Sequence, residues 1–207
     1  MPKPMYVWSG SAWVSVATEV ESLANFATQS YADNTPGMKL VVPTSVAVGS
    51  GSGSIATQGT VTFSGVSSVS LNGCFTSTYQ NYKVIMDITN ASSVLNNLRL
   101  RSSGTDASGS DYDIQINDLA NGNKTTTLNT TALPLHYYGN SANGVVLDIL
   151  KPKDAAITQF QGNSYIENGY CVFGAQHDEA TSYDGFTIYP ASSTMSGTIR
   201  VYGYKAG

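Results

Sequence analysis

Apolar and polar residues alternate in short runs along most of the chain, which is the pattern of β-strands. The clearest run is Tyr82–Thr89, in which Tyr82, Val84, Met86 and Ile88 share one face. Comparable runs predict strands at 60–63, 66–71, 98–101, 111–117, 124–129, 133–138, 144–150, 156–161, 169–175, 184–189 and 197–204. Turn-forming Ser, Asn, Asp and Gly separate these runs. Residues 60–207 are therefore predicted to form an antiparallel β-sandwich, and a jelly roll is the commonest form at this length.

The start of the chain has a different pattern, which predicts a short hairpin. Two aromatic, β-favouring runs flank a Ser-Gly-Ser turn at residues 9–11 and contribute Trp8 and Trp13. A two-stranded hairpin cannot bury two tryptophans by itself. We expect Trp8 and Trp13 to form an attachment site on another subunit or a larger assembly. The alternative is that they pack on the main domain of their own chain.

A helix is predicted directly after this hairpin. Thr18 and Glu21 have the spacing of a helix-capping box. Apolar residues then recur at nearly heptad spacing: Val16, Val20, Leu23 and Ala27. A single helix of about 15 residues is marginal in water. We therefore expect an oligomerisation helix, which together with the hairpin makes up residues 1–36.

Residues 37–59 are predicted to form a strand and a Gly/Ser-rich linker. The strand runs over 38–43 and ends at a proline. Gly and Ser alternate strictly from 49 to 54, which is typical of a flexible linker. The same stretch also fits the tip of a long hairpin, and both interpretations stay open.

Composition narrows the possible classes of function. The chain has a net charge of −4 and only 10 Lys and Arg, whereas Ser, Thr, Asn and Gly are abundant. No basic stripe is available for a nucleic-acid backbone, so we expect no nucleic-acid partner. No apolar run approaches the roughly 18 residues of a membrane span, and no secretory leader is evident. We expect Cys74 and Cys171 to be buried free thiols, with a single disulfide as the alternative.

Motifs for catalysis are missing from the sequence. There is no Gly-x-Ser-x-Gly, and Ser and Thr are too abundant for one to stand out as a nucleophile. Glycosidases use two carboxylates across a cleft, and the acids between 167 and 184 have no defining spacing. The sequence therefore predicts a protein that is not an enzyme and needs no cofactor.

Two short acidic motifs contain residue types that can bind a metal ion. His177, Asp178 and Glu179 are consecutive, and consecutive residues of an extended chain point to opposite faces. Asp111 and Asp113 resemble half of a calcium site, but no calcium-binding loop surrounds them. We therefore expect no metal at either place and place His177 on a solvated loop.

Aromatic residues beside polar ones in predicted loops are the main candidates for recognition. Aromatic faces stack on sugar rings, amides and acids bind hydroxyl groups, and this composition is typical of recognition loops. The alternative is that these tyrosines are half-buried strand residues with hydrated hydroxyls. The candidate receptor-binding residues are Tyr137, Tyr138, Tyr165, His177, Asp178 and Tyr183.

Three stretches of turn and aromatic residues carry a likeness to a known group of proteins. The first is 7–14 together with 23–27 and 31–33. The second is 37–41 together with 69–75 and 78–84. The third is 185–190 together with 197–204. In these stretches the chain resembles virion appendage proteins of tailed bacteriophages, of the tail-fibre, minor-tail and capsid-fibre type. The resemblance implies a virion location and a homotrimer, with the N-terminal segment bound to other virion proteins and the β domain facing outward.

The resulting expectation is a phage structural protein without catalytic activity. Its outward β domain would bind the host surface, with a glycan as the expected receptor. One alternative is a capsid-decoration or tail-connector protein without receptor binding. The other is a polysaccharide depolymerase, although the chain is short for the long groove that such enzymes need.

Overall fold

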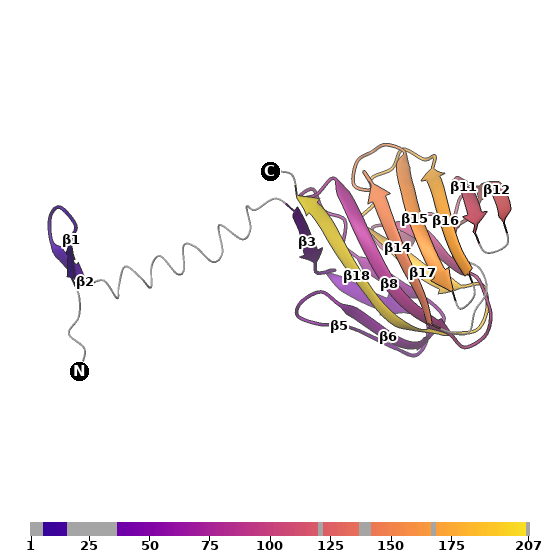
Figure 1. The fold of residues 1–207 in the computed structure, drawn as a ribbon, viewed down its shortest axis with the longest axis horizontal. Helices are drawn as coiled ribbons and strands as arrows, with labels where there is room; N and C mark the ends of the chain where they lie inside the picture. The colour runs from indigo at the N-terminus through magenta and orange to yellow at the C-terminus, as the bar shows by residue number, and fades with distance from the viewer. Residues whose placement is uncertain (1–5, 16–36, 120–121, 137–141, 167–168, 206–207) are drawn as a thin grey trace. The chain divides into compact units, whose positions relative to one another are not determined.

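The computed structural model describes residues 6–15, 37–119, 122–136, 142–166 and 169–205 (Figure 1). Within these ranges every regular element is a β-strand. By its contacts the chain divides into two units, residues 1–37 with 206–207 and residues 38–205. No helix long and apolar enough to cross a membrane occurs among the described residues.

The first unit contains the predicted hairpin. Strand β1 (Tyr6–Trp8) pairs with β2 (Trp13–Ser15) in antiparallel register. The turn closes because the Ser9 backbone N–H and hydroxyl both donate to the carbonyl of Ala12, each at 2.9 Å. The predicted oligomerisation helix with Val16, Val20, Leu23 and Ala27 lies outside the described residues, so it stays a prediction.

The second unit is built from two sheets. The larger has ten strands in the order β12-β11-β16-β15-β14-β8-β18-β6-β5, with β3 paired to β18. Its strands are β3 (Gly37–Val41), β5 (Ser52–Ile55), β6 (Val61–Val66), β8 (Asn81–Asn90), β11 (Tyr112–Asp118), β12 (Asn123–Thr130), β14 (Ala142–Leu150), β15 (Thr158–Ile166), β16 (Gly169–His177) and β18 (Met195–Lys205).

The smaller sheet has six strands in the order β10-β9-β17-β7-β4, with β13 paired to β9. Its strands are β4 (Ser45–Val48), β7 (Val69–Asn72), β9 (Asn96–Ser102), β10 (Thr105–Asp106), β13 (Leu133–His136) and β17 (Gly185–Pro190). Strand β17 lies between β7 and β9, and the next strand, β18, lies between β6 and β8 in the other sheet. The last strands of the chain therefore complete both sheets.

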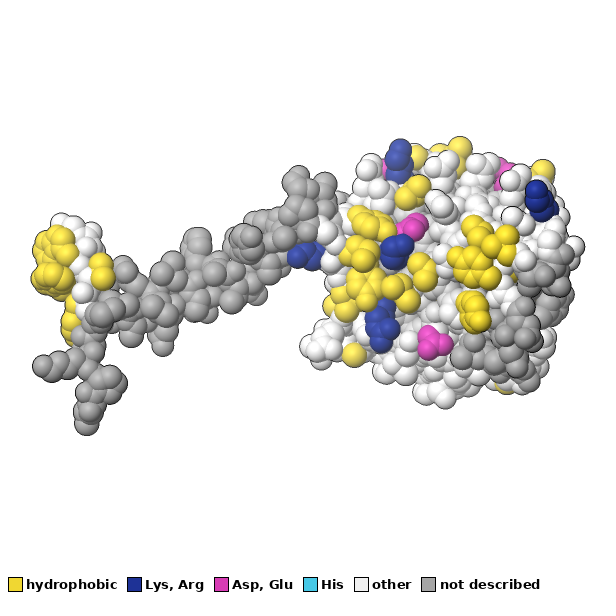
Figure 2. Space-filling view, viewed as in Figure 1, with side chains coloured by type: hydrophobic (Ala, Val, Ile, Leu, Met, Phe, Trp, Pro, Cys, Tyr) yellow, Lys and Arg dark blue, Asp and Glu magenta, His cyan; other side chains and the backbone are white. Residues whose placement is uncertain are grey.

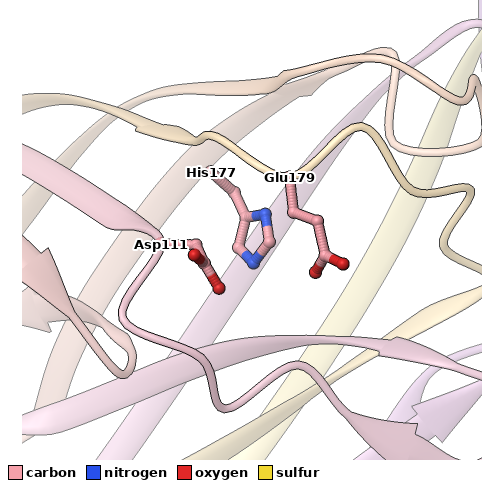
Figure 3. Close-up of side chains that lie close together, drawn as sticks. All are labelled: Asp111, His177 and Glu179. Carbon is pink, nitrogen blue, oxygen red and sulfur yellow. The ribbon is translucent and has the colours of Figure 1, made fainter.

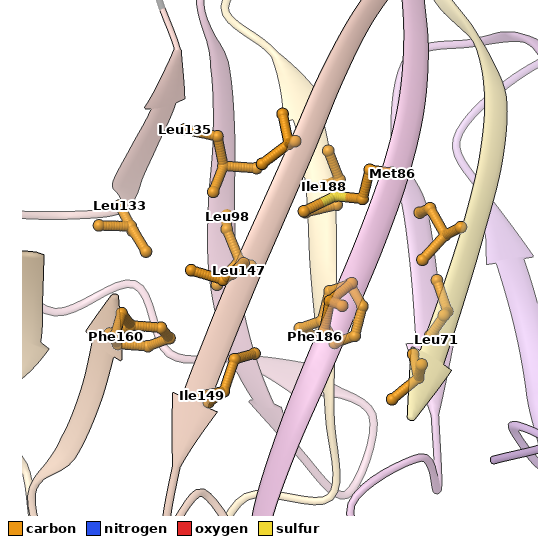
Figure 4. Packing of buried hydrophobic residues seen from close by; sticks show 14 of the residues in the cluster. Leu71, Met86, Leu98, Leu133, Leu135, Leu147, Ile149, Phe160, Phe186 and Ile188 are labelled. Atoms are coloured by element: carbon orange, nitrogen blue, oxygen red, sulfur yellow. The ribbon is translucent and has the colours of Figure 1, made fainter. Parts of the chain in front are cut away.

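The two sheets share one hydrophobic core, so they pack as a sandwich. Leu71, Leu98 and Phe186 come from the smaller sheet, while Met86 and Leu147 come from the larger one (Figure 4). Successive side chains of a strand point to opposite faces of its sheet, so one face of each strand can pack in the core. On β8, every second residue from Tyr82 onward is buried in this way. The prediction of a mainly β chain with antiparallel sheets is confirmed. The jelly-roll form of the sandwich stays a prediction.

The structure refines several predictions from the sequence. The Gly/Ser stretch contains a turn at 49–51 and the start of β5, which pairs with β6, so both ends of the turn lie in the sandwich. Strand β15 continues to Ile166, well beyond the predicted end at residue 161. Cys74 and Cys171 are buried free thiols, as predicted.

Candidate functional site

The outer face of the ten-stranded sheet has a groove over β11, β12, β15 and β16, with a volume of about 910 Å³. That volume lies within the usual range for small-molecule sites. Amide and hydroxyl side chains line much of it, together with two exposed apolar residues. Its lining includes Gln115, Asn117, Thr126, Gln161 and Gln176, with Leu128 and Val172 as the apolar residues.

Strand alternation places these side chains on the outer face. On β11, Tyr112, Ile114 and Ile116 are buried, so the residues between them point outward. Hydrophobic side chains on this side of the domain form separate groups among polar ones, with Lys and Arg near them (Figure 2). The inward residues stabilise the sandwich, and the outward residues line the groove.

Strand register brings the central amides of the groove into one row. Gly174 of β16 pairs with Gln115 on one side and with Gln161 on the other. A Cβ atom at Gly174 would have no heavy atom within 4 Å, so the space above this glycine is open. Gly174 therefore leaves a notch between two amide side chains.

Two exposed tyrosines extend the line of the groove. Tyr165 of β15 lies opposite Tyr170 of β16, and they are 62% and 38% exposed. Tyr170 precedes Val172 by two residues, so its side chain projects on the same face. The two tyrosines, called the tyrosine pair below, therefore adjoin the end of the groove that Val172 lines.

One charged residue of the groove has a structural role. Asp113 Oδ1 accepts a hydrogen bond of 2.9 Å from the backbone N–H of Asn129. Asn129 has a φ of 55°, in the left-handed region, at the far end of β12. Asp113 therefore holds the edge strand that forms one wall of the groove.

A second polar cluster lies on the outer face beside the groove. Asp148, which pairs with Gln161 across β14 and β15, forms a 2.8 Å ion pair with Lys83 and accepts a 2.6 Å hydrogen bond from the Tyr204 hydroxyl. Burial acts to lower the pKa of Lys83, but the hydrogen bonds to Asp148 and Tyr204 outweigh it and raise the pKa. Lys83 therefore stays charged and paired.

Only some of the predicted recognition residues lie at the surface. Tyr165 is exposed but belongs to β15 and not to a loop, and Asp178 is exposed just after β16. His177 and Tyr183 are buried, which corrects their prediction as receptor-binding loop residues. Tyr137 and Tyr138 lie outside the described residues.

The tryptophans predicted to form the attachment site are both on the surface of the hairpin. Trp8 is 54% exposed and Trp13 is 67% exposed. Their ring centroids lie 5.5 Å apart in an edge-to-face arrangement. Tyr6 and Val7 on β1 are also exposed, so the small hairpin presents a mostly apolar surface.

Asp111, His177 and Glu179 come together at one end of the β11–β16 pair (Figure 3). Tyr112 pairs with His177, which places Asp111 beside the end of β16, and Glu179 follows two residues later. One potential ligand atom from each of the three lies within 4.8 Å of the other two. Burial lowers the pKa of His177 although both carboxylates oppose this change, so the neutral imidazole is favoured.

Sequence reasoning missed the groove amides and this three-residue cluster. Outward amides were visible in the predicted strands at 111–117 and 156–161, and they are a signal for a polar binding face. Their convergence depends on strand register, because Gln115 and Gln161 are brought together only through Gly174. The cluster likewise needs the Tyr112–His177 pairing, which no local pattern reveals.

No protein-family model and no curated protein matches the chain. Two solved structures share a weak likeness. The carbohydrate-binding module CBM66 from Bacillus subtilis is 14% identical, with a TM-score of 0.32, over 79% of this chain and 95% of that chain. The sialidase of Trypanosoma rangeli is 11% identical, with a TM-score of 0.28, over 94% of this chain and 38% of that chain. Neither likeness is close enough to carry an argument about this chain.

Proposed function

We propose that the β domain binds a glycan through the groove and the tyrosine pair. The observation that carries this proposal is the row of outward amides that ends beside Tyr165 and Tyr170. Each amide offers both donors and an acceptor, which matches the hydroxyl groups of a sugar. An exposed tyrosine offers an apolar face for stacking and a hydroxyl that stays hydrated.

The groove supports binding without catalysis. Among the described residues that line it, Asp113 is the one acid, and it already holds the backbone of Asn129. Hydrolysis of a glycosidic bond usually employs a pair of carboxylates on opposite sides of that bond. We therefore assign the groove to recognition and not to depolymerisation.

We further propose that the chain is a homotrimeric virion appendage of the phage tail-fibre type. The sequence resemblance to phage appendages and the exposed apolar hairpin support this assignment. The hairpin would dock to another virion protein through Trp8 and Trp13, and the predicted helix would align three chains. The β domain would be a jelly-roll-like sandwich on the outward side, since β17 and β18 return to pair between earlier strands.

A glycan array tests the binding proposal. The full chain should bind a restricted set of bacterial surface glycans, and Tyr165→Ala should weaken binding at least about fivefold, because stacking of one ring contributes about 1 to 3 kcal/mol in comparable aromatic contacts. Tyr6→Ala is the matched control, since Tyr6 is 52% exposed but lies on the hairpin. Equal loss of binding in both variants, or no binding by the wild type, would contradict the proposal.

Cryo-electron microscopy of intact particles tests the virion assignment. Three copies per tail appendage, with the β domain outermost, are expected. Copies spread over the capsid lattice would favour the alternative of capsid decoration. Absence of the chain from particles would overturn the virion assignment but leave the glycan array to decide the binding proposal.

A further inference from the structure

The cluster of Asp111, His177 and Glu179 contains a buried imidazole nitrogen that no hydrogen bond satisfies among the described residues. The side chain of His177 has no exposed surface, and its Nε2 atom has no hydrogen-bond partner among the described residues. A buried nitrogen of this kind normally has a partner, because leaving it unpaired costs roughly 1 to 3 kcal/mol. Figure 3 shows the imidazole lying between the two carboxylates.

Neighbouring tyrosines fix the imidazole in position. The Tyr112 and Tyr183 rings lie edge-on to His177, with centroid distances of 4.3 and 5.3 Å. The Tyr183 hydroxyl lies 3.4 Å from Nδ1. A proton on Nδ1 facing this hydroxyl leaves the lone pair on Nε2, which is the arrangement in which a second-shell partner sets the tautomer of a metal-binding histidine.

We propose that Asp111, His177 and Glu179 bind one Zn²⁺ ion. Imidazole together with carboxylates suits zinc, whereas calcium prefers oxygen ligands alone. Three protein ligands leave a fourth position for water. The ligand atoms now lie within 4.8 Å of one another, and ligands around tetrahedral zinc lie roughly 3.3 Å apart. Because Glu179 is exposed, a rotation of its side chain toward the cluster would bring the ligand atoms closer together.

The ion would tie together two connections at one end of the sandwich. Asp111 precedes β11, while Glu179 belongs to the segment between β16 and β17. The backbone N–H of Asp178 already donates to the carbonyl of Asp111 at 2.9 Å, so the two segments touch without the metal. Zinc would therefore stabilise an existing contact, since any ligand that binds only the folded state raises its stability.

Zinc binding by the full chain tests the proposal. After removal of metals with a chelator, the wild type should take up one Zn²⁺ per chain by mass spectrometry and competition with a chromogenic chelator, and its melting temperature should rise. Glu179→Gln should weaken zinc binding at least about tenfold, because even indirect partners of a ligand contribute 10- to 100-fold. The exposed position of Glu179 means that this variant should fold.

Asp178→Asn is the matched control, because it removes the same charge one residue away and Asp178 is also exposed. It should bind zinc as the wild type does. Failure of the wild type to bind zinc would overturn the proposal, as would equal weakening by Glu179→Gln and Asp178→Asn. Binding of Ca²⁺ in preference to Zn²⁺ would overturn the role of the imidazole. None of these outcomes depends on glycan binding.

Discussion

Leu98 on β9 has no exposed surface and lies in the shared core of the two sheets (Figure 4). Leu98→Ala should lower the free energy of unfolding by about 2 to 5 kcal/mol, because it removes buried surface and leaves a cavity. Leu128→Ala is the control, since Leu128 is 58% exposed and should change stability little. Urea unfolding of both variants checks this, and equal losses would contradict the position of the core.

The hydroxyl of Tyr82 contributes stability that is lost at high pH. It accepts a 2.6 Å hydrogen bond from the backbone N–H of Thr76 and donates to the Thr76 carbonyl at 2.8 Å. Burial raises the pKa of Tyr82 above its ordinary value of 10.0. The unfolded chain therefore loses this proton first, so stability is intact below about pH 10 and falls as the pH rises further.

Tyr82→Phe should separate this effect from the other tyrosines. At pH 8 the variant should lose about 1 kcal/mol of stability with the hydrogen bonds. Above pH 10 its stability should fall less steeply than that of the wild type. Urea unfolding between pH 8 and 11 measures both slopes, and parallel curves would show that Tyr82 does not contribute to the alkaline loss.

The two cysteines should be unreactive in the folded protein. Burial raises the pKa of both the Cys74 and the Cys171 thiols, and the thiolate is the reactive form. Labelling with a thiol reagent at pH 8 should be slow for the native chain and fast for two thiols per chain in denaturant. Rapid labelling of the native chain, or fewer than two thiols after unfolding without reductant, would contradict the buried free thiols.

Single residues show where sequence reasoning reached its limit. Tyr165 is an exposed aromatic residue, but it lies on β15 and not in the loop that the sequence predicts. The sequence predicts a strand that ends at residue 175 and places His177 in the loop after it, yet His177 is the last residue of β16 and fully buried. The burial of a polar residue at a strand end depends on the elements packed over it, which no neighbouring residue indicates.

At the scale of elements, two glycines with the same backbone angle should behave differently. Gly51 and Gly65 both have a φ of 63°. A Cβ on Gly51 would lie 2.1 Å from the carbonyl oxygen of Ser64, whereas one on Gly65 would meet no heavy atom within 4 Å. Position 51 therefore needs glycine for two reasons: its φ lies in the left-handed region, and no side chain fits there.

The corresponding alanine variants measure these two contributions. Gly65→Ala should cost about 1 to 2 kcal/mol, which is the strain of the left-handed backbone. Gly51→Ala should cost clearly more, because the backbone of β6 must move away. Thermal unfolding of both variants gives the comparison, and equal melting temperatures would contradict the close approach of the β4–β5 turn to β6.

The alternation of apolar and polar residues is sufficient to predict most strands but not their full lengths. The run at 82–89 is confirmed within β8 because its inward residues are all large and apolar. Strand β15 extends to Ile166, but Gly162 and Ser164 occupy its inward positions there. Small inward residues hide the period of two, so the apolar pattern predicts a strand that ends at residue 161.

At the scale of the whole molecule, pairings between distant segments create the groove. Strand β11 pairs with β16, so Gln115 lies beside Gly174 although many residues separate them in sequence. A single-sequence pattern predicts that both strands exist but not that they are neighbours. The sandwich class was therefore predictable, whereas the groove, its amide row and the Asp111–His177–Glu179 cluster were not.

A crystal structure of the full chain with a glycan identified on the array tests the central claim most directly. The proposed function predicts that the sugar lies in the groove, with one ring against Tyr165 and hydroxyls bonded to Gln115 and Gln161. A glycan bound at another surface, with the groove holding only water, would contradict it.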